Sequence, residues 1–219
     1  MTRLLNACHH FPGFVYGRAR LCEETATVEI EVRPRRGSKG RCSGCGRPAP
    51  GYDQLPVRRF EFIPLWGFGV MLLYAMRRVQ CPGCGVKVEQ VPWAVGKHTL
   101  CEAYMVFLAR WARRLSWQET ARTFHTSWEK VLDAVEYVVQ CGLQRRSLEG
   151  IRAIGVDEIA YGRGHQYLTL VYQIEAGCQR LLWVGQERTR ESFARFFARF
   201  GPERCQRLEF VCSDMWRPY

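Results

Sequence analysis

The chain has 219 residues, of which 47% are hydrophobic, and its formal net charge is +11. This length suits one or two domains, and the hydrophobic content excludes wholesale disorder. No apolar run approaches the ~20 residues of a membrane span, and the N-terminus lacks the apolar stretch of a signal peptide, so we expect a cytoplasmic protein.

The positive charge is concentrated in the first part of the chain. Residues 1–150 contain 22 basic and 13 acidic side chains, and residues 33–97 alone contain 12 and 3. Of the 32 basic residues, 28 are arginine, the side chain that binds phosphate or guanine through two parallel hydrogen bonds. A concentrated basic field attracts a polyanion, so the N-terminal half predicts a nucleic-acid partner.

The first 97 residues form the first predicted domain. Residues 25–32 alternate as a strand does, and residues 33–41 form a basic, turn-rich loop. Residues 57–80 alternate again around an apolar middle, which predicts a β-hairpin. We expect its four arginines to contact DNA phosphates: Arg58, Arg59, Arg77 and Arg78.

Two Cys-x-x-Cys pairs flank this hairpin, namely Cys42 with Cys45 and Cys81 with Cys84. Four thiolates at this spacing satisfy tetrahedral zinc, and the glycines around them allow tight turns. The chain has 11 cysteines, an odd number, without a signal peptide, which favours metal binding over disulfides. The pattern therefore predicts a structural zinc ribbon without catalytic function.

Residues 98–148 change to a helical period and form the second predicted domain. We expect helices over 100–115, 117–124 and 128 to about 141, with Ser116 and Ser127 as N-caps and Gly142 as the C-terminal stop. The short helices resemble a helix-turn-helix whose second helix would bring Trp128 and Lys130 to the DNA groove. A plain helical packing module is the alternative, because the second helix also carries an acidic face.

Residues 151–219 return to strands and form the third predicted domain. We expect strands over 151–159, 166–175, 180–185 and 207–213, with a helix from Thr189 to the Gly201-Pro202 stop. This order is the beginning of an RNase H-like domain, in which the first and fourth strands are neighbours. Asp157 in the first strand and Asp214 at the end of the fourth could then share Mg²⁺ or Mn²⁺. On spacing alone, the alternative is that the two aspartates are turn or cap residues.

Several stretches are similar to insertion-sequence DDE transposases of the IS-L-three family. They are residues 154–172, which begin Ile-Gly-Val-Asp-Glu, then Leu182-Trp-Val-Gly, and Ser213-Asp-Met-Trp-Arg-Pro-Tyr219. Family members also carry an N-terminal zinc-binding segment that ends in a Cys-Pro-x-Cys-Gly knuckle, followed by helix-turn-helix segments. The resemblance spans almost the whole chain in the right order.

The resemblance implies a multidomain α+β protein with a zinc ribbon, a helix-turn-helix-like module and part of an RNase H-like domain. It further implies a bacterial, nucleoid-associated transposase that binds element ends as double-stranded DNA, could do so as a homodimer, and cleaves and transfers strands with Mg²⁺ or Mn²⁺. By this similarity, Asp157 and Asp214 are the first two acidic residues of the DDE triad.

The family's third acidic residue, a glutamate, lies further along than this sequence extends, which suggests a C-terminally truncated chain. Glu158 is no substitute, since adjacent strand residues point to opposite faces. We therefore expect this chain alone to be inactive. Two alternatives remain open from the sequence: a non-enzymatic, zinc-dependent DNA-binding protein or repressor derived from a transposase, and a metal nuclease completed by another subunit.

Overall fold

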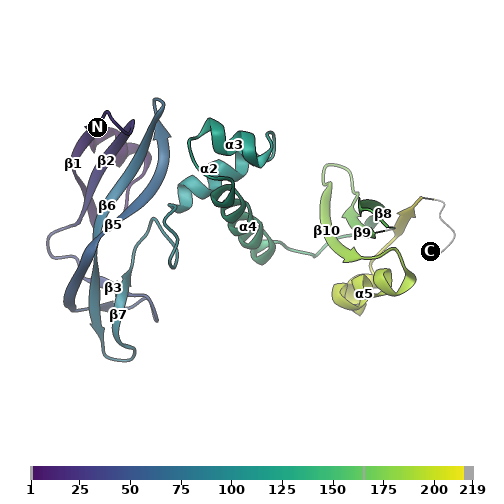
Figure 1. The fold of residues 1–219 in the computed structure, drawn as a ribbon. Helices are drawn as coiled ribbons and strands as arrows, with labels where there is room; N and C mark the ends of the chain where they lie inside the picture. Colours follow the sequence, from purple (N-terminus) through teal and green to yellow (C-terminus); the bar gives the residue numbers. More distant parts are fainter. Residues whose placement is uncertain (1, 165, 215–219) are drawn as a thin grey trace. The chain divides into compact units, whose positions relative to one another are not determined.

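The structure is a computed structural model, and it describes residues 2–164 and 166–214. The chain divides into two compact units, Met1–Arg145 and Arg146–Tyr219 (Figure 1). The three segments expected from the sequence are thus distributed over two units, because the helical segment shares a hydrophobic core with the N-terminal sheet. In the described part of the chain, no helix combines the length and apolar character that a membrane crossing requires.

The first unit is built on a sheet of seven strands among the described residues, in the order β1-β2-β6-β7-β3-β4, with β5 also paired to β6. Its strands are β1 (Phe14–Cys22), β2 (Thr27–Pro34), β3 (Gly40–Cys42), β4 (Pro48–Ala49), β5 (Gly51–Leu65), β6 (Phe68–Cys81) and β7 (Gly85–Gln90). Its helices are α1 (Thr2–Cys8), α2 (Glu102–Ala112), α3 (Trp117–Thr123) and α4 (Trp128–Arg145).

The expected hairpin is confirmed as the long pair β5–β6 (Figure 1), in which β6 also pairs with β2 and β7. Leu65 pairs with Phe68, so the turn has only two residues, Trp66 and Gly67, with φ of +52° and +84°. Positive φ at both positions gives the turn whose twist matches that of the strands. The pair is longer than expected, since β5 starts at Gly51 rather than near residue 57.

Trp93 is the centre of the aromatic core of the first unit and is only 1% exposed. Its ring lies 4.8 Å from Phe14, 5.1 Å from Phe11 and 5.3 Å from Tyr74, measured between centroids. Buried side chains of α2, α3 and α4 belong to the same core: Tyr104, Met105, Leu108, Ala121, Val131 and Ala134. The helices are therefore fixed to the sheet by shared apolar burial.

The expected capping box at the start of α3 is confirmed. The Ser116 hydroxyl accepts a hydrogen bond from the Glu119 amide at 3.2 Å, and the Ser116 amide donates to the Glu119 carboxylate at 2.9 Å. These hydrogen bonds lower the pKa of Glu119, so the box weakens when acidification protonates the carboxylate. The expected stop at Gly142 is wrong, because α4 continues to Arg145 through residues that favour helix.

Removing the cap should destabilise the first unit by about 1 kcal/mol. We expect Ser116→Ala to lower the denaturant midpoint in chemical unfolding, since the Glu119 amide at the start of α3 loses its hydrogen-bond acceptor. Thr123→Ala is the matched control, because Thr123 is exposed at the other end of α3. Equal midpoints for the two variants would contradict a stabilising role for the box.

The second unit is a sheet of four strands among the described residues, in the order β10-β9-β8-β11, with helices on one side. Its elements are β8 (Ala153–Gly162), β9 (Gln166–Gln173), β10 (Arg180–Gln186), α5 (Arg190–Phe200), α6 (Pro202–Cys205) and β11 (Phe210–Ser213). Thr189 caps α5 as expected, accepting a hydrogen bond from the Ser192 amide at 3.1 Å, and Gly201 ends it with φ of +94°.

One face of this second sheet packs against α5. Ile154, Val171 and Leu182 form a core with Phe196 and Phe200, as the spacing of the phenylalanines predicts. The pair β8–β9 is antiparallel and the pair β8–β11 is parallel. The expected adjacency of the first and fourth strands of this segment is therefore confirmed.

Candidate metal centres and DNA-binding surface

The four paired cysteines come together at one end of the first unit. Their Sγ atoms all lie within 4.8 Å of one another, and the Sγ atoms of Cys45 and Cys81 are 3.6 Å apart. Four sulfurs bound to one tetrahedral zinc at ~2.3 Å would be spaced by about 3.8 Å. The residues present therefore fit a metal ion such as zinc.

Two similar tight turns position these sulfurs. Cys42 ends β3 and Cys81 ends β6, and each Cys-x-x-Cys pair is followed by a glycine with φ of +71°, Gly46 and Gly85. The Gly46 amide donates to the Cys42 carbonyl at 2.7 Å, which closes the first turn. A side chain at a φ of this sign is strained, which explains the glycine after each pair.

The four cysteines also shift the pKa values of one another's thiols. A hydrogen bond from the Gly83 amide lowers the pKa of the Cys81 thiol to about 7, whereas Cys45 and Cys81 raise the pKa of Cys84 to about 12. Hydrogen bonds of the Cys84 thiol with Cys45 and Cys81 are the main cause of its raised pKa, and repulsion from a Cys45 thiolate adds to them. A bound cation removes this repulsion, so the arrangement of the cysteines favours metal over four free thiols.

Of the two predicted acidic ligands, Asp157 lies in the middle of β8, which continues to Gly162, and Asp214 directly follows the neighbouring parallel strand β11. Ser213 of β11 is opposite Val156 of β8, and Asp214 and Asp157 are the next residues of each strand. Both aspartates are exposed, whereas Ile154 and Val156 are buried on the α5 side. The Glu158 amide donates to the Asp157 carboxylate at 2.8 Å. The motif residues 215–219 lie outside the described residues.

Three of the four hairpin arginines keep part of their side chain exposed while they contact partners within the first unit. Arg58 donates to the His98 carbonyl at 2.9 Å, and Arg59 forms an ion pair with Glu29 at 2.7 Å. Arg78 binds both carboxylate oxygens of Asp53. These arginines are exposed enough to reach a second anion, but their intramolecular partners compete for the same hydrogen-bond donors.

Arg77 is different, because its side chain is only 14% exposed and faces Glu89, whose side chain is fully buried. The Nε and Nη2 atoms of Arg77 lie 2.9 and 2.6 Å from the Glu89 carboxylate, and Nη1 donates to the Ser38 carbonyl. Tyr74 also donates its hydroxyl to Glu89. This network holds β6 to β7 and leaves the guanidinium little access to DNA.

Trp128 and Lys130, the two residues of the helical module predicted to contact DNA, differ in whether their side chains are free to bind a ligand. Trp128 is 47% exposed at the start of α4. Lys130, two residues further in the same turn, forms an ion pair with Glu61 of β5 at 2.5 Å. Lys130 therefore links α4 to the sheet, and Trp128 is the one of the pair whose side chain is open to a ligand.

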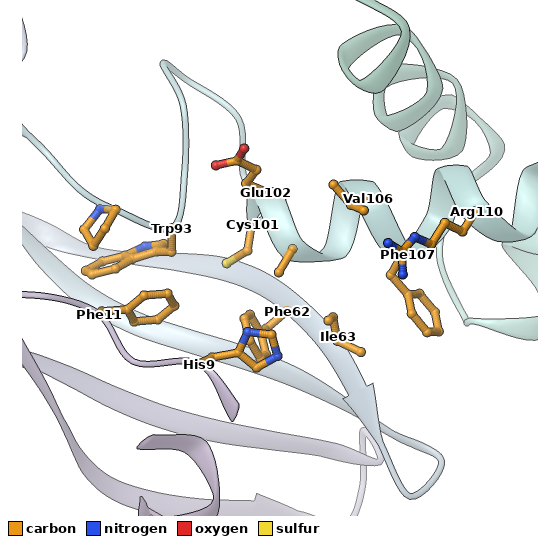
Figure 2. Close-up of a pocket in the computed structure, with 12 residues that line it drawn as sticks. His9, Phe11, Phe62, Ile63, Trp93, Cys101, Glu102, Val106, Phe107 and Arg110 are labelled. Carbon is orange, nitrogen blue, oxygen red and sulfur yellow. The ribbon is translucent and has the colours of Figure 1, made fainter. Parts of the chain in front are cut away.

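A cavity of about 440 Å³ lies between the sheet and α2 (Figure 2). Its walls include Phe11, Phe62, Trp93 and Cys101, and Arg110 lies at one end. Burial raises the pKa of the Cys101 thiol well above its usual range, so Cys101 is not an activated nucleophile. We assign the cavity no catalytic role.

Comparisons with known proteins agree with this arrangement of residues. A family model described as a transposase matches residues 154–219. The chain is 32% identical over 193 residues to the transposase for insertion sequence element IS1557 of Mycobacterium tuberculosis, which covers 86% of this chain and 43% of that protein. It is 26% identical over 219 residues to the transposase for insertion sequence element IS1001 of Bordetella parapertussis, which covers 99% of this chain and 53% of that protein.

No solved structure shows a significant match, and the chain spans about half the length of the curated relatives it matches. These matches relate the chain to the transposases of insertion sequences. More specifically, residues 154–219 are similar to the IS-L-three family of transposases.

Proposed function

We propose that this chain supplies the DNA-binding region and the first two catalytic carboxylates of an insertion-sequence transposase. It would bind the terminal inverted repeats of its element as double-stranded DNA and take part in metal-dependent strand cleavage and transfer. The observation that carries the proposal is the parallel register of β8 and β11, which supports neighbouring positions for Asp157 and Asp214. The strand order of the second unit, 3-2-1-4, is that of the first four strands of an RNase H-like domain.

Asp157 and Asp214 fit a hard divalent cation. Both are exposed carboxylates at corresponding positions of a parallel pair, and residues at corresponding positions point to the same face of a sheet. Carboxylate oxygens suit Mg²⁺ or Mn²⁺, and such an ion stabilises charge on the oxygens of a phosphate during its transfer. The two aspartates would hold the ion, and the hydrogen bond from the Glu158 amide would orient the Asp157 carboxylate.

Zinc at Cys42, Cys45, Cys81 and Cys84 would have a separate, structural role. All four positions are cysteines, and a site with four protein ligands has no open position for a substrate. We propose that this zinc fixes the ends of β3, β6 and β7, so that the basic first unit keeps one shape on DNA.

The turn between α3 and α4 supports a helix-turn-helix role for these helices. His125 has φ of +52°, a conformation for which many such turns use glycine. The Thr126 amide donates to the Ala121 carbonyl at 3.0 Å, and the Ser127 hydroxyl accepts from the Lys130 amide at 3.4 Å. Trp128 would be a contact to the DNA groove at the start of α4.

The metal proposal predicts that the zinc-loaded chain binds Mn²⁺ through its aspartates. We expect Asp157→Asn with Asp214→Asn to weaken Mn²⁺ binding at least roughly tenfold, because two charged ligands are lost. Binding is followed by the electron paramagnetic resonance signal of free Mn²⁺. Glu158→Gln is the matched control, since Glu158 is adjacent in sequence but on the opposite face of β8.

Two outcomes would count against the proposal. Equal Mn²⁺ affinity in the unmutated chain and the double variant would remove the two-aspartate site. If a chain without this metal site still binds duplex DNA, the non-enzymatic DNA-binding alternative would be favoured.

A further inference from the structure

We propose that the C-terminal end of α2 is a phosphate-binding surface for duplex DNA, formed by Arg110, Arg113 and Arg114 around the indole of Trp111. The inference rests on the proposed function, namely that this chain binds DNA. It concerns a part of the molecule outside the hairpin and the second helix of the helical module, where the sequence alone predicts the DNA contacts.

These four residues surround one hollow in the surface. The hollow has a volume of about 650 Å³ and is lined by Phe107, Arg110, Trp111, Arg113 and Arg114. Phe107, Arg110 and Trp111 occupy one face of α2, and Arg113 and Arg114 directly follow its last residue, Ala112. Arg110, Trp111, Arg113 and Arg114 are exposed. The surface is therefore open to a ligand.

The three arginines lack an acidic partner within ion-pair distance among the described residues. In the part of the chain that the structure describes, none of them forms an ion pair, in contrast to Arg59, Arg77 and Arg78 of the hairpin. Like charges four positions apart on a helix destabilise it by a few tenths of a kcal/mol. The helix dipole favours cations at this end but does not require three of them. An anionic partner would remove their mutual repulsion.

Trp111 provides a rigid base for this cluster. Its ring lies 5.5 Å from Phe124 and 6.4 Å from Phe107, and Phe107 and Phe124 are 4.8 Å apart. The indole is nevertheless 40% exposed. An aromatic ring held on one side and open on the other can pack against a sugar between two phosphates, while the arginines bind the phosphate oxygens.

Duplex DNA is the anion that fits this geometry best. Arginines four positions apart have Cβ atoms separated by about 6 Å, and phosphate charges of one strand follow one another every ~3.4 Å along the helix axis. Long guanidinium side chains can thus reach successive phosphates of one strand. Such contacts position the protein without reading sequence, so the surface should serve specific and non-specific DNA equally.

The test measures binding of the full, zinc-loaded chain to a fluorescent duplex over a series of salt concentrations. We expect Arg110→Ala, Arg113→Ala and Arg114→Ala together to weaken binding roughly tenfold or more and to reduce the slope of log K against log salt by about 2 to 3. A variant with lysine at the three positions should keep most of that slope, since it keeps the charge.

The matched control removes the same charge from the basic loop, through Arg35→Ala, Arg36→Ala and Lys39→Ala, all of which are exposed. If the loop variant loses more affinity for the duplex than the helix variant does, the inference about the end of α2 is overturned. The proposal that the chain binds DNA would still hold. A loss confined to single-stranded DNA would also overturn the inference. If the unmutated chain binds no duplex, the proposed function fails together with this surface.

Discussion

Replacing Cys42 and Cys81 together with serine should abolish metal binding and unfold the end of the first unit that the cysteines hold. Purified chain should contain about one zinc ion per molecule, and the double variant should contain none. The reason for the structural effect is the small size of the core at this end. Among the described residues, the buried hydrophobic side chains of this end are Cys42, Ala49, Val79 and Cys81, and they form a cluster separate from the main core of the unit.

A cluster of this size cannot stabilise three short strands by apolar burial alone. Binding of structural zinc contributes as much as ~10 kcal/mol in small zinc-binding peptides, so its loss should exceed the local stability here. Hydrogen exchange is the direct measurement. The amides of Cys42 and Ser43, which donate to the Arg47 and Val88 carbonyls, should exchange at least roughly a hundredfold faster in the variant.

Amides of the main core, such as those of β6 near Leu72, should keep their protection. Cys8→Ser with Cys212→Ser provides the control, because both cysteines are exposed and neither belongs to the cluster. Retention of zinc by the Cys42 and Cys81 double variant, or unchanged exchange at Cys42 and Ser43, would contradict the assignment of the metal site.

Features encoded by short spacings could be predicted from the sequence. The cysteine pairs, the Ser116–Glu119 box and the glycine end of α5 depend on residues within a few positions of one another, and all three are found in the structure. The order of strands in the second unit could also be predicted, because each strand is apolar enough to be recognised by itself.

Features that depend on distant partners could not be predicted. β1 was missed because Gly17, Arg18 and Arg20 interrupt its apolar residues, and its register shifts between Tyr16 and Ala19. The hairpin arginines were assigned to DNA because no local signal reveals their partners. Arg58 binds a carbonyl 40 positions away, and Arg78 binds an aspartate 25 positions away. Conversely, Arg110 and its neighbours gave no pattern that separated them from an ordinary helix end.

Arg77 is predicted from the sequence to contact DNA, but in the structure it pairs with the buried Glu89. Replacing Arg77 should therefore lower the stability of the first unit rather than its DNA affinity alone. We expect Arg77→Ala to destabilise the first unit by about 3 to 5 kcal/mol, because the buried Glu89 carboxylate loses its charged partner. The remaining hydrogen bonds to Glu89, from the Arg77 amide at 2.8 Å and from Tyr74, do not neutralise the charge. Denaturant unfolding of the zinc-loaded chain measures the effect.

Arg78→Ala is the matched control, since Arg78 is the next residue and its ion pair with Asp53 is exposed on both sides. Exposed pairs contribute at most about 1 kcal/mol, so this variant should unfold close to the unmutated chain. Glu89→Gln combined with Arg77→Met separates charge from packing, because a neutral pair removes the buried charge that the single variant leaves behind. The double variant should therefore recover part of the lost stability. A stable Arg77→Ala chain with weakened DNA binding would show that Arg77 contacts phosphate after all.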